Sequence, residues 1–135
     1  MKIFLERKPN TLIAHALHIN EHQFIADVTA ADGGEDLGPS PHDLYDAALA
    51  SCKALTVMWY ANKRGIKIEQ LETRIERNDE QERQGVYKLE TTLKIKGNFS
   101  DQEFNQLVAV AEKCPIHKLM TSVVTEITTK MERIQ

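Results

Sequence analysis

The sequence predicts an α+β protein, and three observations lead to this class. Short apolar runs separated by turn residues predict strands in residues 1–30. Two later segments alternate apolar and polar residues with a period of two, as half-buried antiparallel strands do. Two other segments repeat apolar residues at the spacing of a helix. The chain contains no internal repeat and no composition break, so we expect residues 1–135 to form a single domain.

Composition and charge limit the range of partners. Hydrophobic residues make up 41% and charged residues 27% of the chain, values typical of folded globular proteins. The formal net charge is −3 and no basic patch stands out, which argues against nucleic acid and against an anionic membrane. The N-terminus lacks the apolar core of a signal peptide, and the richest apolar run carries Asp46 and Lys53. We therefore expect a cytoplasmic protein with no nucleic-acid partner and no membrane partner.

Strands and turns are indicated along much of the chain. Six segments have the composition of strands: 2–6, 11–19, 22–30, 66–77, 86–97 and 125–134. Asn20-Glu21 marks a turn, and the polar stretch 78–85 is expected to be a hairpin loop. Together the strands would form one sheet of about six strands.

A long central helix has clear start and stop signals. Ser40 is a good N-cap, Pro41 suits the first helical position, and Asp43 lies three residues after the cap. Gly65 ends the helix, and the cations Lys63 and Arg64 occupy its last turn, where the helix dipole favours them. The helix therefore has more than 20 residues and spans roughly 30 Å.

A second helix is predicted by a capping box at Ser100–Glu103 and by an apolar stripe at helical spacing. The stripe consists of Phe104, Leu107, Val108 and Ala111. This helix should end near Lys113, because Pro115 pushes Cys114 out of the helical region. A short helix from Ile116 to about Ser122 is expected next.

The central helix is apolar on nearly all sides, which requires burial on several sides. One sheet covers only one side of such a helix, and an uncovered apolar remainder marks an interaction surface. The economical solution is a homodimer in which two such helices pack between two sheets. The alternative is a monomer whose second helix and loops cover the far side.

Two motifs carry a resemblance to a known family. The segment GPSPHDLYDAALASCKALTVMWYANKRG, which contains Cys52, and the segment AEKCPIHKLM, which contains Cys114, resemble the OsmC-like family. This family includes osmotically inducible protein C and the organic hydroperoxide resistance proteins. The resemblance covers about residues 37–135. It implies an OsmC-like fold in which antiparallel sheets wrap around two long central helices in an intertwined homodimer.

The resemblance also implies thiol peroxidase chemistry. By position, Cys52 would be the peroxidatic cysteine and Cys114 its resolving partner. The substrate would be a small organic hydroperoxide and the reductant a dithiol, and no cofactor (metal, haem or flavin) is implied. A thiolate attacks the peroxide bond to give a sulfenic acid, and a second cysteine condenses with it to a disulfide.

The sequence departs from the family at the groups that activate the thiolate. Characterised peroxidases of the family use an arginine from the N-terminal region and a glutamate about ten residues before the cysteine. Here His42 occupies the glutamate's position, and the one arginine before Cys52 is Arg7. Lys53, His42 or His117 would have to supply the positive or donating group. The predicted catalytic residues are therefore Cys52, Cys114 and His42.

Each of these residues also has a structural interpretation. Cys52 could be a small core residue, Cys114 could simply end a helix before proline, and His42 could be an exposed polar residue. Asp43 is more simply explained as a helix-start residue than as an acid in the chemistry. A metal site formed by the histidines near residues 15–22 is rejected, because strand positions 15 and 18 face opposite sides.

The two cysteines form no CxxC pair, so neither a zinc site nor a structural disulfide is expected. Two other functions remain open from the residues alone. One is a non-catalytic protein that binds an apolar ligand at the dimer interface. The other is a redox sensor in which a Cys52–Cys114 disulfide alters a partner surface.

Overall fold

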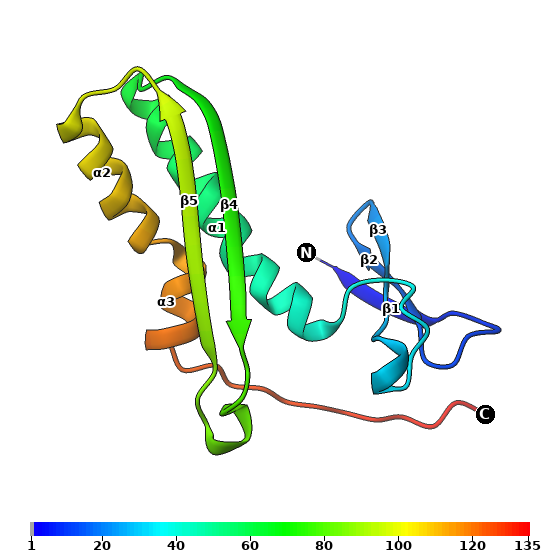
Figure 1. Cartoon of the computed structure of the whole chain (residues 1–135). Coiled ribbons are helices and arrows are strands. Elements are labelled where there is room, and N and C mark those ends of the chain that lie inside the picture. The colour runs from blue at the N-terminus through cyan, green and yellow to red at the C-terminus, as the bar shows by residue number, and fades with distance from the viewer. Residues whose placement is uncertain (1) are drawn as a thin grey trace. The chain divides into compact units, whose positions relative to one another are not determined.

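Figure 1 shows the computed structural model of the chain, which describes residues 2–135. The described residues form an α+β fold with antiparallel sheets and three α-helices, as predicted. The strands are β1 (Ile3–Arg7), β2 (His15–Ile19), β3 (His22–Ala26), β4 (Ile68–Asn78) and β5 (Lys88–Gly97). The helices are α1 (Pro41–Arg64), α2 (Asp101–Glu112) and α3 (Pro115–Ser122), with short 3-10 turns η1 (Ala30–Asp32) and η2 (Glu82–Gln84).

The described chain divides into two compact units. The first contains residues up to Ala48 together with Ile75–Glu90, and the second contains Leu49–Arg74 together with Thr91–Gln135. The division falls within α1, β4 and β5. That the whole chain forms a single domain stays a prediction.

The first unit contains a three-stranded antiparallel sheet with β2 in the centre. Leu17 of β2 pairs with Leu5 of β1 on one side and with Phe24 of β3 on the other. Asn20 has a positive φ of 54° in the turn between β2 and β3, a conformation that asparagine tolerates better than most residues. All three strands lie within or next to the predicted segments.

Asp27 organises the loop that leads from this sheet to α1. One carboxylate oxygen accepts the Val28 N–H at 2.8 Å, and the other accepts the N–H groups of Glu35 and Leu37, each at 3.1 Å. Burial acts to raise the pKa of Asp27, but the three backbone hydrogen bonds outweigh it and lower the pKa. An ionised Asp27 therefore holds the loop closed.

Helix α1 begins and ends at the predicted residues. Ser40 Oγ accepts the Asp43 N–H at 3.1 Å, and the Asp43 carboxylate accepts the Ser40 N–H at 3.0 Å, which is a reciprocal N-terminal cap. At the other end, Gly65 has a φ of 68°, and the Ile66 N–H bonds the Ala61 carbonyl at 2.9 Å. The positive φ of Gly65 and this hydrogen bond form the left-handed glycine cap that commonly ends a helix. Asp43 thus acts as the helix-start residue that the sequence indicates.

The second unit has a core in which α1 and α2 pack against β4 and β5. Val57 and Ala61 of α1, Leu107 of α2 and Ile66 are buried together. Partly buried residues of the hairpin complete this core: Ile68, Leu71, Leu93 and Ile95. Along β5 the side chains alternate between exposed and partly buried, as the period-two pattern predicts. Figure 1 shows α1 and α2 beside this hairpin.

Two predictions about strands are wrong for the single chain. The five strands form a three-stranded and a two-stranded sheet rather than one sheet of about six strands. Residues 123–135 form neither helix nor strand, although a last strand is predicted at 125–134. A strand requires hydrogen bonds to a neighbouring backbone. Among residues 2–135 this segment has no strand partner, and it exposes large apolar residues, Val124, Ile127, Met131 and Ile134.

Helix α1 buries one stripe and leaves other apolar residues exposed. The buried stripe consists of Asp46, Leu49, Lys53, Val57 and Ala61. Leu55 and Trp59 on the same helix remain 69% and 61% exposed. Large exposed apolar side chains on a helix indicate a surface that something else covers.

Candidate dithiol site

Cys52 lies in the middle of α1, where its side chain is partly exposed. Its Sγ is 3.9 Å from the hydroxyl oxygen of Thr56, one helical turn later. A sulfur–hydroxyl contact of this length is a weak hydrogen bond. Cys52 is thus the more exposed of the two cysteines.

Cys114 lies at the junction of α2 and α3 and is completely buried, with 0% of its surface exposed. It is the N-cap residue of α3, in an extended conformation that Pro115 imposes on the residue before it. Its Sγ accepts the backbone N–H of His117 at 3.4 Å. The Cys-Pro pair thus ends one helix, starts the next and aims the sulfur inward.

The two thiols are neighbours in the fold. The side chains of Cys52 and Cys114 are hydrogen bonded to each other, and both cysteines are free thiols. Burial raises the pKa of Cys114, and the hydrogen bond with Cys52 raises it further. The His117 N–H and the positive charge of Lys53 lower the pKa without cancelling these effects. Cys114 therefore favours its protonated form, in which its S–H can donate to Cys52.

A buried cation lies in the same unit. Lys53 follows Cys52 on α1 and is only 5% exposed. Its Nζ donates to the carbonyl of Ala111 at 2.8 Å and lies 3.0 Å from Nδ1 of His117. The sequence indicates Lys53 and His117 as possible stand-ins for the family's arginine and glutamate. The sequence does not indicate that Lys53 and His117 contact each other. It does contain one signal that Lys53 is buried, which is its helical spacing with the apolar residues Leu49 and Val57.

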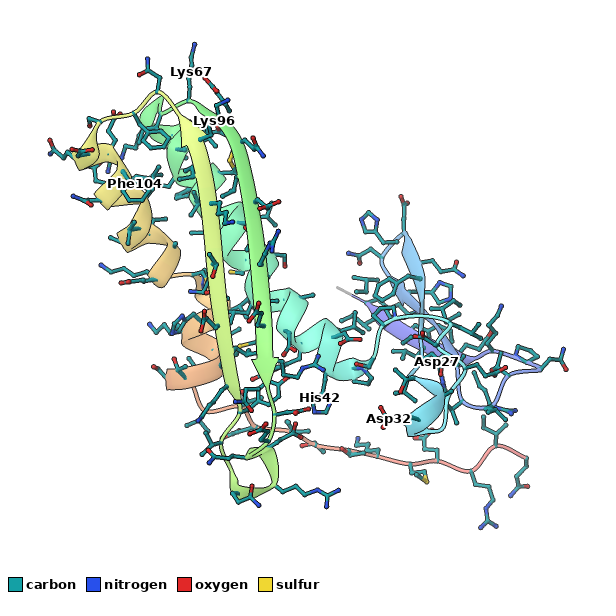
Figure 2. All side chains as sticks on the ribbon, in the orientation of Figure 1. Asp27, Asp32, His42, Lys67, Lys96 and Phe104 are labelled. Carbon is teal, nitrogen blue, oxygen red and sulfur yellow. The ribbon has the colours of Figure 1, made fainter. Side chains whose placement is uncertain are left out.

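His42 has other partners. It lies in the first turn of α1, and its Nε2 is 3.0 Å and 3.1 Å from the two carboxylate oxygens of Glu82. Figure 2 shows this side chain near the start of the helix. Cys52 is ten residues further along the same helix, an axial rise of about 15 Å. The structure therefore brings Cys52 and Cys114 together but not His42 with them, and a catalytic role for His42 stays a prediction.

An apolar cavity of about 220 Å³ borders Lys53. Its walls come from α1, the β4–β5 hairpin and α2, and include Val57, Leu71, Leu93 and Leu107. Lys53 and Glu112 are the charged residues in its lining. The cavity can hold an apolar group beside a single buried ammonium.

Within residues 2–135 no three histidine, cysteine or acidic side chains are grouped so that they could hold a metal ion. In the same part of the chain, no helix has both the length and the apolar character needed to cross a membrane.

The fold and the site together define an α+β protein with a hydrogen-bonded pair of free cysteines, one partly exposed and one buried. The family described as OsmC-like protein matches residues 33–130, and this chain belongs to that family. No curated protein matches the sequence.

Solved structures confirm the fold. A protein of Psychrobacter arcticus assigned to the osmotic stress and detoxification response is 16% identical, with a TM-score of 0.74 over 90% of this chain and 89% of its own. An organic hydroperoxide resistance protein OsmC from Legionella pneumophila is 21% identical, with a TM-score of 0.63 over 90% of each chain. The organic hydroperoxide resistance protein OhrB of Bacillus subtilis is 23% identical, with a TM-score of 0.55 over 90% of this chain and 92% of its own.

Proposed function

We propose that this protein is a thiol-dependent peroxidase that reduces organic hydroperoxides through Cys52 and Cys114. One observation carries the proposal: the thiols of a partly exposed and a buried cysteine are hydrogen bonded to each other. A peroxidatic cysteine must meet its substrate, and a resolving cysteine must lie within bonding reach of it. Two structural neighbours of this chain are named as hydroperoxide resistance proteins, which agrees with this chemistry.

In the first step, the Cys52 thiolate attacks one oxygen of the peroxide bond. The sulfur–oxygen bond forms as the oxygen–oxygen bond breaks, so sulfur loses two electrons and the peroxide gains them. Cys52 becomes a sulfenic acid, and the departing alkoxide takes a proton and leaves as the alcohol. A protonated Cys114 supports this step, because its S–H can donate a hydrogen bond to the Cys52 thiolate.

In the second step, Cys114 loses its proton and attacks the Cys52 sulfur. The disulfide bond forms, the sulfur–oxygen bond breaks, and the departing hydroxide takes a proton and leaves as water. An external dithiol then reduces the disulfide and becomes a disulfide itself, which restores both thiols. No cofactor takes part in this cycle.

The apolar cavity supports a preference for organic peroxides. Burying an alkyl group contributes about 25 cal/mol per Å² of apolar surface, and hydrogen peroxide has no such surface. The cavity borders Lys53, the residue after Cys52, and lies in the same unit as the two thiols.

We also propose that the protein works as a homodimer in the cytoplasm. The exposed apolar residues of α1, Leu55 and Trp59, and the unpaired apolar segment 123–135 support a second copy as the covering surface. A compartment that keeps thiols reduced suits a cycle that starts from two free thiols.

The test is stopped-flow oxidation of the purified protein with cumene hydroperoxide and with hydrogen peroxide. The wild type should react faster with the organic peroxide and turn over with a dithiol. The Cys52→Ser variant should lose the reaction. The matched Cys114→Ser variant should still form a sulfenic acid but should not form the intramolecular disulfide. Oxidation at the rate of free cysteine, whether or not Cys52 is present, would overturn the proposal.

A second candidate function is a non-catalytic protein that binds an apolar ligand, and the cavity beside Lys53 favours it. The same experiment separates the two. A binding protein would show slow oxidation that does not depend on Cys52, and an apolar fluorescent probe would be displaced by ligands in both wild type and the Cys52→Ser variant.

A further inference from the structure

Lys53 is a buried cation with two hydrogen-bond partners. Its side chain is directed into the unit by α1, and the contacts with Ala111 and His117 hold its Nζ at 2.8 Å and 3.0 Å. An ammonium carries three N–H donors, and these contacts use two of them. Burial of a charge costs free energy unless partners compensate it. A lysine in this place therefore calls for an explanation beyond packing.

His117 connects Lys53 to Cys114. Because an ammonium has no acceptor, a charged Lys53 donates this hydrogen bond and Nδ1 of His117 accepts it. The backbone N–H of the same residue donates to Cys114 Sγ at 3.4 Å. One residue thus orients the cation and donates to the buried sulfur.

The resolving step requires charge at this buried sulfur. Cys114 must become a thiolate to attack Cys52, yet burial and the neighbouring thiol both favour its protonated form. The groups that act on Cys114 in the opposite direction are the His117 N–H and the charge of Lys53. Glu112 also lines the cavity, but its negative charge cannot stabilise a thiolate on Cys114.

We propose that Lys53 is the electrostatic partner of the Cys114 thiolate in the resolving step, and that His117 is the residue that positions it. The inference rests on the proposed peroxidase function and assigns the group that drives its second half. Lys53 stabilises the negative charge that develops on Cys114 as its proton leaves. That charge disappears when the disulfide forms and the hydroxide lost from Cys52 takes up a proton.

The experiment separates the two steps by stopped-flow in the full-length protein. A first phase follows formation of the Cys52 sulfenic acid, and a second phase follows formation of the disulfide. Lys53→Met removes the charge but keeps a side chain of similar length. In this variant we expect the rate of the second phase near pH 7 to fall about tenfold or more. The rate of the first phase should change much less, so that the sulfenic acid accumulates. Lys53→Arg should retain most of the second-phase rate.

The control is Lys113→Met, which removes the same charge from the residue next to Cys114. Lys113 is exposed to solvent, so its charge is screened. The rate of the second phase in the Lys113→Met variant should match that of the wild type. Equal slowing in the Lys53 and Lys113 variants would overturn the inference, because it would show an effect of net charge alone.

The pH profile of the second phase distinguishes an electrostatic role from a structural one. Lys53 lowers the pKa of Cys114, so its removal should move the rise of the second-phase rate to higher pH. A lower rate with an unchanged profile would mean that Lys53 acts only through packing, and the inference would fail.

Variants of His117 test the same point if Lys53→Met does not fold. His117→Asn keeps an acceptor near the place of Nδ1, whereas His117→Leu removes it. We expect the leucine variant to shift the profile to higher pH and the asparagine variant to restore it. Identical profiles in the two variants would overturn the inference. A wild-type protein that forms no Cys52 sulfenic acid would instead overturn the proposed peroxidase function.

Discussion

The guanidinium of Arg77 joins the end of β4 to the start of α1 by donating to Oδ2 of Asp46 at 2.6 Å. The hydroxyl of Tyr87 donates to the other oxygen of Asp46, also at 2.6 Å. A second bond from Arg77 reaches Asp43 at 2.8 Å. The neighbouring carboxylates raise the pKa of Arg77 above its usual value, so the guanidinium stays charged. Within the first unit this cluster links α1, β4 and Tyr87, the residue before β5.

The two carboxylates that accept from Arg77 form a matched pair for mutation. The Asp46 side chain is 7% exposed and that of Asp43 is 52% exposed. Asp46→Asn leaves the charge of Arg77 without its buried partner and should lower the free energy of unfolding by about 2–3 kcal/mol. Asp43→Asn keeps a good N-cap partner and should cost less than about 1 kcal/mol. Urea unfolding would measure both, and equal losses would contradict the structure.

Tyr87 should titrate late. Burial raises the pKa of Tyr87 to about 12, and the hydrogen bond to Asp46 adds to this effect. Because the folded protein favours the protonated phenol, the stability that Tyr87 contributes is present below pH about 10 and is lost towards pH about 12. Subtracting the phenolate absorbance titration of Tyr87→Phe from that of the wild type should leave one transition near pH 12. A difference transition at the usual tyrosine value would refute this.

Asp27 should make the first unit sensitive to acid. Because its pKa is lowered in the fold, the stability that it contributes is present above the usual carboxyl pKa and is lost as pH falls through the folded value. In Asp27→Asn the amide nitrogen cannot accept, so a backbone N–H loses its partner. The variant should unfold at lower urea concentration at neutral pH, and its stability should depend less on pH.

The control for this prediction is Asp32→Asn in the same loop. Asp32 is exposed, and its carboxylate accepts from the hydroxyl of Thr29 at 3.1 Å. The urea midpoint of the Asp32→Asn variant, and the pH dependence of its stability, should stay close to those of the wild type. A larger effect at Asp32 than at Asp27 would show that the loop is held by other contacts.

Trp59 should report on assembly. Its side chain is exposed on α1 in the single chain, and in a homodimer it would be covered. The wild type should sediment as a dimer, and Trp59→Glu should shift it to the monomer because a carboxylate is costly at an apolar interface. Gln102→Glu adds the same charge at an exposed position of α2 and should remain dimeric. A monomeric wild type would contradict the prediction.

Much of the fold could be predicted because its signals are local. Ser40 and Asp43 cap α1 through residues three apart, and Gly65 ends it through its own backbone conformation. The capping box of α2 is present as the sequence indicates, with Ser100 and Glu103 each bonding the backbone of the other. The family motif identified the two cysteines as a pair.

The missing strand had a different cause. Residues 125–134 have the composition of a strand, but composition does not supply the backbone partner that a strand needs. In the sequence, Lys53 stands as a charged residue within an apolar run, which does not by itself indicate that its side chain is buried. The structure instead places it inside, at the same helical spacing as its buried neighbours.

By itself the sequence determined the helices and their ends, five of the six predicted strands and the family, because capping, turn chemistry and side-chain periodicity act within a few residues. Only the tertiary structure decided which distant groups meet: the thiol of Cys52 with that of Cys114, and the ammonium of Lys53 with the ring of His117. Such contacts depend on how α1, α2 and α3 pack, and the burial of the whole core determines that packing.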